Sequence, residues 1–247
     1  MPLTRKGVAP AALAVLLASC ASARDWRTAD RSSANIAPKP AAERRAVVQV
    51  YAARTIRWRG YFAVHTWVAL KDKDAASYEV LQVVGWRLRR GLSPVSIEPG
   101  EPDRRWYGAE PSLICDLRGD KAESAIAEIR RAAAEYPYRA GYRTWPGPNS
   151  NTFTSHLLRS APELGVDLPP TAIGRDWLVR GRPLARSESG TGVQFSLFGL
   201  LGFTVGLRDG IEVQVLGLAF GVDFLRPALK LPMIGRVGMR VAPLRRA

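Results

Sequence analysis

Residues 47–51 and 61–70 are rich in β-branched and aromatic side chains, which is the pattern of β-strands, whose side chains alternate between two faces. Residues 78–88 repeat a strand pattern after the polar loop 71–74, so we expect a hairpin. In the segment 61–70 the alternation separates two faces. One face carries Phe62, Val64, Thr66, Val68 and Leu70, and the other carries Ala63, His65, Trp67 and Ala69.

A helical period marks two further segments. The first begins near Asp120, whose spacing to Glu123 resembles a capping box, and ends before Pro137. The second follows the proline-rich turn 145–148, where Asn149 and Ser150 are favoured N-cap residues. The pattern therefore predicts two main helices.

The C-terminal third alternates again. Residues 193–197 and 211–215 have strand patterns, and Asp209-Gly210 is a hairpin signal. Residues 193–207 carry no charge but are too short and glycine-rich for a transmembrane helix. We expect packed antiparallel strands, with a hairpin lying against a membrane as the alternative. The basic, proline-broken residues 226–246 suggest a loose or wrapping tail.

These patterns predict an α+β fold: an antiparallel sheet with two main helices, extended by a C-terminal β-hairpin. Residues 46–247 are expected to form one globular domain. Within it, residues 46–180 form the core and residues 181–247 form the glycine-rich hairpin and the basic tail.

The N-terminus has the pattern of an export signal. Arg5 and Lys6 precede an uncharged segment, residues 7–18, which has the length of a signal-peptide core. Leu17-Ala18-Ser19-Cys20 resembles the lipobox of bacterial lipoproteins, which implies cleavage after residue 19 and a lipid on Cys20. Cleavage of an ordinary signal peptide at Ala21-Ser22-Ala23 is the alternative.

Residues 20–45 are poor in large apolar side chains, so they should form a flexible tether behind the lipidated cysteine. By resemblance to Gram-negative lipoproteins, Ala21 implies sorting to the periplasmic face of the outer membrane. The membrane is thus the expected partner, through the lipid on Cys20.

The chain is strongly basic, with 36 Lys and Arg against 22 Asp and Glu, a formal charge of +14 and a pI near 10.5. In an exported protein this charge favours anionic envelope components over nucleic acid. Charge that serves solubility alone is the alternative.

Few residues carry recognisable chemistry. The two histidines are His65 and His156, and the sequence contains no HExxH, GxGxxG, GxSxG or Cys/His metal spacing. We therefore expect no metal and no cofactor. What remains is His65 on a strand and Ser150 at a helix start, where unpaired N–H groups and the helix dipole face outward.

A catalytic arrangement can be built from these groups. Ser150 would be the nucleophile and His65 the general base, with N–H groups around Asn149 to Asn151 as oxyanion donors. Gln82 or Glu79 on the next strand would orient His65, but the sequence does not fix the register. The alternative is that Ser150 only caps a helix and His65 is a buried core imidazole.

A ligand site is the other possibility. Aromatic and arginine side chains cluster in Trp67, Trp145 and the loop segment Arg104-Arg105-Trp106-Tyr107. Such side chains bind anionic groups and sugars. They predict a cleft for an anionic or glycan ligand, to whose binding Asn149 and Asn151 would also contribute.

Several motifs together resemble a known bacterial family. They are Val64-His65-Thr66-Trp67, Val84-Gly85-Trp86, Asp103-Arg104-Arg105-Trp106-Tyr107-Gly108, Ala172-Ile173-Gly174 and Trp145-Pro146-Gly147-Pro148-Asn149-Ser150-Asn151-Thr152-Phe153. From about Val47 to Val241 the sequence resembles the family called domain of unknown function 3750, which has no assigned activity.

A more remote similarity concerns circularly permuted papain-fold peptidases, in which a strand histidine precedes Asn-Cys-Asn-x-Phe at a helix start. It implies a permuted papain-like core, with Ser150 in the place of the thiol. Because a helix dipole does not ionise a hydroxyl, Ser150 would need His65 as a base. The hypotheses are therefore an envelope lipoprotein with hydrolase or acyltransferase activity, or a non-catalytic binding or structural lipoprotein.

Overall fold

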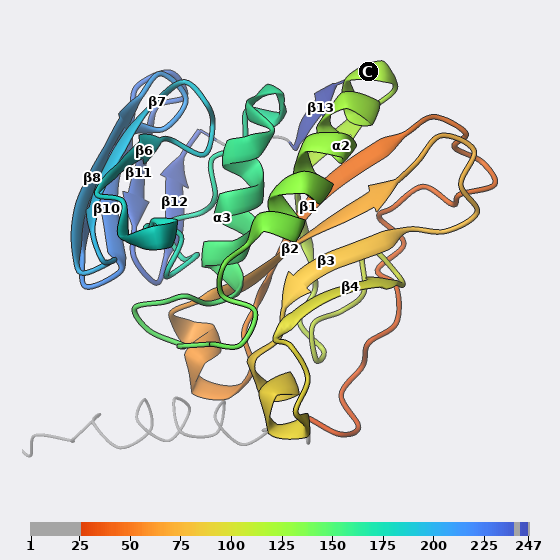
Figure 1. The fold of residues 1–247 in the computed structure, drawn as a ribbon. Coiled ribbons are helices and arrows are strands. Elements are labelled where there is room, and N and C mark those ends of the chain that lie inside the picture. Colours follow the sequence, from red (N-terminus) through yellow and green to blue (C-terminus); the bar gives the residue numbers. More distant parts are fainter. Residues whose placement is uncertain (1–25, 240–242, 247) are drawn as a thin grey trace, which may run out of the picture.

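The computed structural model describes residues 26–239 and 243–246 (Figure 1). The predicted signal peptide and the lipidated Cys20 lie outside the described residues. None of the helices in the described part of the chain has the length and apolar character needed to cross a bilayer. The fold is α+β, as predicted, but it contains two large sheets instead of one sheet with a hairpin.

Sheet 1 is built from six strands in the order β13-β5-β1-β2-β3-β4. All neighbours are antiparallel except β13, which pairs in parallel with β5. Short 3₁₀ helices η1 and η2 follow β1 and β3. The bounds are β1 (Val47–Arg54), η1 (Arg57–Tyr61), β2 (Val64–Lys71), β3 (Glu79–Val83), η2 (Gly85–Arg90), β4 (Val95–Pro99), β5 (Ser112–Arg118) and β13 (Leu244–Arg246).

Both faces of sheet 1 are apolar. Val50, Val68 and Leu117 pack on the face covered by α2 (Asp120–Glu135) and α3 (Ser150–Ser160). The far face holds a second cluster around Tyr51 and Trp67. The predicted alternation in β2 is confirmed, because Val64, Val68 and Leu70 belong to the helix-side cluster whereas Trp67 and Ala69 belong to the far-side cluster. Burial on both faces makes this sheet the core of the molecule.

Residues 26–45 pack along the far side of sheet 1, which differs from the flexible tether expected for residues 20–45. The Asp103 carboxylate accepts hydrogen bonds from the Ser33 hydroxyl (2.7 Å) and the Ala37 N–H (3.0 Å). The Tyr78 hydroxyl donates to the Pro38 carbonyl (3.0 Å). Polar side chains of distant loops thus anchor a segment that has little apolar surface of its own.

Sheet 2 contains seven antiparallel strands in the order β12-β11-β10-β9-β8-β7-β6. The predicted turn at Asp209-Gly210 does join β8 to β9, but the basic tail forms additional strands instead of a loose end. The elements are η3 (Pro162–Leu164), η4 (Val179–Gly181), β6 (Leu184–Arg186), β7 (Gly192–Leu197), β8 (Leu201–Gly206), β9 (Gly210–Val215), β10 (Leu218–Asp223), β11 (Ala228–Leu231) and β12 (Gly235–Gly238).

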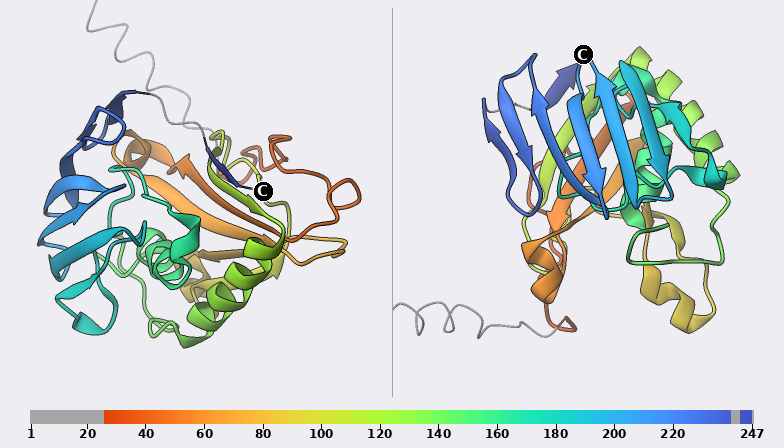
Figure 2. Two further views of the ribbon diagram at one scale, coloured as in Figure 1. Left: turned by 90° about the horizontal axis from the view of Figure 1, so that it is seen from above. Right: turned by 90° about the vertical axis from the view of Figure 1, so that its left-hand side faces the viewer.

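The two sheets lie on either side of α3 (Figure 1), and one face of sheet 2 is turned away from the rest of the molecule (Figure 2, right). Its inner face is held by buried ion pairs. Arg175 contacts Asp167 (3.1 Å) and Glu188 (3.4 Å), and it also pairs with Glu212 on β9. Lys230 on β11 pairs with both Asp167 and Glu212. Sheet 2 is therefore attached by charges, whereas sheet 1 is packed by apolar side chains.

Candidate functional site

A cavity of about 630 Å³ opens where β2 and α3 both begin. Its walls come from η1, η2, the loop before α3 and the β9–β10 turn of sheet 2. Most of the lining is aromatic or aliphatic, and it includes Trp58, Trp86, Trp106, Tyr142, Trp145 and Leu216. His65 and Ser150 both line this cavity. The structure therefore brings the two predicted chemical groups to one space.

The start of α3 is fixed by Asn149, as its N-cap character predicts. The Asn149 Oδ1 accepts hydrogen bonds from the N–H groups of Asn151 (2.9 Å) and Thr152 (3.1 Å). The Asn149 N–H in turn donates to the Thr152 hydroxyl (3.1 Å), which completes a capping box. Gly174 must lack a side chain here, because a Cβ would lie 2.2 Å from Asn149 Nδ2.

Asn151 ties the start of α3 to the strand that carries His65. Its Oδ1 accepts a hydrogen bond from the Thr66 hydroxyl (2.9 Å), and its Nδ2 donates to the carbonyls of Val64 (3.0 Å) and Ile173 (2.8 Å). The side chains of Asn149 and Asn151 are thus occupied in holding the site together. Neither is available as the ligand-binding group that the sequence suggested.

Ser150 differs from both of its neighbours. Within the described residues, neither its hydroxyl nor its backbone N–H makes a hydrogen bond. The capping box uses the N–H groups on either side, so of the predicted oxyanion donors only the Ser150 N–H is left. Ser150 is thus a buried residue, 7% exposed, that lines the cavity and has unpartnered polar atoms.

His65 is held in one orientation. Its Nε2 lies 3.1 Å from the Gln82 Oε1, and its ring stacks on Trp106 with centroids 3.7 Å apart. Because the Gln82 oxygen accepts, Nε2 carries the proton and Nδ1 is the unprotonated nitrogen. Nδ1 has no hydrogen-bond partner among the residues described. His65 can therefore accept a proton only at Nδ1.

The surroundings keep His65 neutral. Burial lowers its pKa to about 3, with the nearby Arg104 charge lowering it further and the Gln82 hydrogen bond opposing the shift. The imidazole is consequently an unprotonated acceptor at neutral pH. The same burial also disfavours the imidazolium that would form during proton transfer.

The two groups approach the cavity from different sides of sheet 1. The His65 ring stacks with Trp67 and Trp106 on the far face, whereas α3 covers the opposite face. They share a cavity because His65 is the second residue of β2 and Ser150 is the first residue of α3. No hydrogen bond joins them in this structure.

Glu79 is not the orienting residue. It lies opposite Leu70 near the other end of the β2–β3 pair, and its carboxylate contacts Arg130 of α2 (3.0 Å). Gln82 instead pairs its backbone with Ser96 and sends its side chain to His65. The register of the hairpin thus selects Gln82.

The predicted ligand-binding residues divide into two groups. Trp106 and Trp145 line the cavity. Trp67 does not, because it is buried and its Nε1 donates to the Pro102 carbonyl (2.7 Å). Arg104 is half-buried beside Trp106, and burial lowers its pKa.

The last two predicted ligand-binding residues serve the N-terminal segment instead. Arg105 binds Glu110 (2.7 Å) and the Ser33 carbonyl (2.8 Å). The Tyr107 ring is covered by the Arg31 guanidinium at 4.5 Å. Both are therefore scaffold residues.

Several residues that line the cavity were not predicted from the sequence. Trp58 and Phe62 come from η1, and Trp86 comes from η2. Arg59 and Arg89 also line the cavity, and neither forms an ion pair with any described residue. The only available signal was the aromatic and basic composition of the segments that flank β2 and β3.

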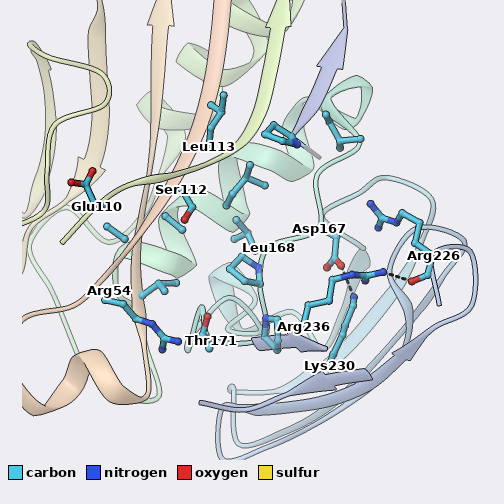
Figure 3. Close-up of a pocket in the computed structure, with 18 residues that line it drawn as sticks. Arg54, Glu110, Ser112, Leu113, Asp167, Leu168, Thr171, Arg226, Lys230 and Arg236 are labelled. Carbon is cyan, nitrogen blue, oxygen red and sulfur yellow. Dashed lines mark hydrogen bonds and ion pairs between the residues drawn. The ribbon is translucent and has the colours of Figure 1, made fainter. Parts of the chain in front are cut away.

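A second cavity of about 370 Å³ lies between the sheets (Figure 3). Its charged groups are already paired. Asp167 binds Arg175 and Lys230, and Arg226 and Arg236 both bind Asp223. We therefore place the candidate chemistry in the larger cavity, where the polar atoms are unpartnered.

Within the described ranges, no group of three His, Cys, Asp or Glu side chains is arranged to hold a metal ion.

Comparison with known protein families gives a match to one family model. The family model described as "Protein of unknown function (DUF3750)" covers residues 45–177, which include β1 to β5, α2, α3 and the region from His65 to Ser150. Searches of curated proteins and of solved structures gave no match.

Proposed function

The chain belongs to the DUF3750 family, and from its site we propose that it is an acyl-transfer protein that acts on an ester or amide through Ser150. One observation carries this proposal. The hydroxyl and N–H of Ser150 and the Nδ1 of His65 are unpartnered within the described residues, and both residues line the same cavity. A buried hydroxyl and a buried imidazole nitrogen with purely structural roles would be expected to hydrogen-bond within the protein.

The proposed reaction uses each of these atoms once. The Ser150 Oγ attacks the carbonyl carbon of the substrate while its proton passes to the His65 Nδ1. The Ser150 N–H stabilises the oxyanion, and the imidazolium returns the proton to the leaving alcohol or amine. Water, or a second acceptor, then releases the acyl group from Ser150 by the same steps. Gln82 fixes the ring but adds no negative charge.

The cavity favours an amphiphilic substrate. Its walls are mainly aromatic and aliphatic, which suits an acyl chain or another apolar group. Arg59 and Arg89 supply positive charge for an anionic head. We therefore expect a lipid-like ester or amide in preference to a polar peptide.

Covalent labelling tests the proposal. A fluorophosphonate probe should label the full chain, and the Ser150→Ala and His65→Ala variants should lose the label. Ser112→Ala is the matched control, because Ser112 is exposed and lies in the other cavity. Labelling that survives in Ser150→Ala would show that the reactive group is elsewhere.

The pH dependence of labelling provides a second check. Because burial holds the pKa of His65 at about 3, the base is already unprotonated above pH 5. The labelling rate should therefore stay level from pH 5 to 8. A rate that rises about tenfold per pH unit in this range would show a base with an ordinary or raised pKa.

A cysteine substitution tests the geometry without requiring activity. Ser150→Cys places a thiol with an ordinary pKa near 8.5 at the helix start beside His65. We expect iodoacetamide to modify the introduced thiol of the Ser150→Cys variant much faster than the thiol of the native Cys115, which is buried. Equal, slow modification of the two positions would mean that the site is closed.

Binding without chemistry is the second candidate, and a specific observation favours it. A pKa of about 3 and a neutral Gln82 leave the imidazolium with little stabilisation. The cavity would then only hold its ligand. This function predicts no fluorophosphonate label, together with a rise in melting temperature on adding a short-chain anionic phospholipid, which Trp145→Ala should weaken.

We also propose that the protein is an envelope lipoprotein anchored through Cys20 on the periplasmic face of the outer membrane. The lipobox-like sequence at residues 17–20 and the net charge of +14 support this location. The matched variant is Cys20→Ser, which should move the protein from the membrane to the soluble fraction of cells. Retention of Cys20→Ser at the membrane would argue against the anchor.

A further inference from the structure

The outer face of sheet 2 is covered by apolar side chains that face solvent. Three rows of paired residues cross the strands. The first row is Val193, Val205, Ile211, Val222, Leu229 and Val237, the second is Leu184, Phe195, Phe203, Val213 and Phe220, and the third is Leu197, Leu201, Val215 and Leu218. We call these rows the apolar face.

This arrangement is opposite to that of an ordinary soluble sheet, which turns its polar side to water. On the inner side of the same strands lie Gln194, Thr204, Glu212 and Lys230, all buried. Almost every member of the apolar face is exposed, including Val213 at 47% and Val193 at 51%. A continuous apolar surface of this kind marks a site of interaction.

We propose that the apolar face docks on the surface of a lipid bilayer. Apart from Arg186, which ends the first row on the edge strand β6, the rows contain no charged or hydrogen-bonding side chain. By contrast, even the core of a protein–protein interface is only about 65% apolar, and interfaces carry many hydrogen bonds. Strands that face lipid show this alternation, with apolar side chains outside and polar side chains inside. The chemistry of the face therefore matches acyl chains better than a protein partner.

The turns of sheet 2 extend the apolar surface. Phe198 and Leu200 lie in the β7–β8 turn, and Phe224 and Leu225 lie between β10 and β11. All four side chains are exposed. Turns usually carry polar residues, so exposed phenyl and leucyl groups at both ends of the strands lengthen the face along the strand direction.

Charge at one edge fits an anionic membrane surface. Three exposed arginines lie at the edge of sheet 2: Arg180 in η4, Arg182 directly after it, and Arg186 in β6. None of them forms an ion pair with a residue in the described ranges. Basic residues that flank an apolar surface are attracted to anionic headgroups, each contributing about 1 kcal/mol near the surface.

Docking would also bring the cavity to the bilayer. Leu216 and Leu218 line the cavity and belong to the β9–β10 end of sheet 2, and the Trp145 Nε1 donates to the Leu216 carbonyl (2.8 Å). The cavity thus borders the apolar face. The docking inference stands on sheet 2 alone and does not require Ser150 to be reactive.

The test is a position-specific probe on the full chain in vesicles of phosphatidylcholine and phosphatidylglycerol. An environment-sensitive dye is placed on Val213→Cys, and on Leu92→Cys as the matched control. Leu92 is equally exposed, at 48%, but it follows η2 in the sheet 1 part of the chain. The chain without an introduced cysteine is treated in parallel as the labelling background.

Lipids with brominated acyl chains should quench most of the emission at position 213 and leave position 92 unchanged. Adding Phe203→Glu to the labelled Val213→Cys chain should restore the emission, because a carboxylate on the face opposes docking. Quenching that is equal at the two positions, or absent at both, overturns the inference. An emission shift at position 213 that needs no lipid and rises with protein concentration means that a second copy covers the face, which also overturns it.

Discussion

The two sheets of this protein place their apolar residues in opposite ways. Sheet 1 buries apolar side chains on both faces, against α2 and α3 on one side and against residues 26–45 and the Trp106 loop on the other. Sheet 2 buries charged and amide side chains and exposes its apolar rows. Alternation in a sequence therefore identifies an apolar face but does not show whether that face points toward the core or toward solvent.

The sheets also differ in what holds them. Sheet 1 is stabilised by burial of aliphatic and aromatic side chains, a non-directional effect that grows with buried area. Sheet 2 is attached through Arg175, Lys230 and their carboxylate partners, which are stable only as a complete set. Although burial opposes it, Asp167 and Glu212 hold the pKa of Lys230 above its ordinary value.

The largest effect is expected from removing the central cation of this network. Arg175→Met leaves Asp167, Glu188 and Glu212 without their shared partner, so we expect a loss of about 3–5 kcal/mol in the free energy of unfolding. Urea titration measures the change. The matched control is Arg130→Met, which removes a half-exposed arginine from surface pairs and should cost about 1 kcal/mol or less. Similar losses in the two variants would contradict an attachment by buried charge.

A pair of phenylalanines compares the sheets directly. Phe153→Ala empties a fully buried position between α3 and sheet 1 and should cost about 3–5 kcal/mol. Phe203→Ala changes an exposed position on sheet 2, where we expect a change within about 0.5 kcal/mol. Both are measured by urea unfolding in the absence of lipid. A large cost for Phe203→Ala would show that something already covers the outer face.

A smaller, pH-dependent effect is expected from His65. Its pKa of about 3 in the folded protein lies below the ordinary value of 6.5, so between these values the unfolded chain binds a proton that the folded chain does not. The contribution of His65 to the free energy of unfolding is therefore complete above pH 6.5 and is lost as the pH falls. The loss should be roughly 1 kcal/mol between pH 6 and 5.

The His65→Gln variant isolates this effect. Asp176 acts in the opposite direction, because burial raises its pKa to about 6. Its contribution to the free energy of unfolding therefore grows as the pH falls. The difference between the wild type and His65→Gln cancels Asp176 and all other shared groups. If that difference is constant from pH 7 to 5, His65 titrates normally and is not buried as described.

The part of the site that could be predicted from the sequence depends on local rules. Asn149 caps α3 because its side chain bonds to N–H groups two and three residues ahead, and the two-residue period placed His65 and Thr66 on opposite faces of β2. Such interactions involve near neighbours in the chain. The shared cavity of His65 and Ser150 was also expected, although their reactivity is still a proposal.

What could not be predicted depends on distant partners. The choice of Gln82 over Glu79 required the register of β2 and β3, and the ordering of residues 26–45 required Asp103 to accept the Ser33 hydroxyl and the Ala37 N–H. Only a hairpin was expected where sheet 2 lies, because each of its short, glycine-rich strands has a weak strand pattern in the sequence. Its outward apolar face appears only when Arg175 and Lys230 are seen to occupy the inside.

The most direct test of the division between the sheets is hydrogen–deuterium exchange of the full chain with and without anionic vesicles. We expect lipid to slow exchange in the turns of sheet 2, at residues 198–200, 216–217 and 224–227, and to leave β1 to β5 unchanged. Slower exchange confined to sheet 1, or no difference on adding vesicles, would contradict the account.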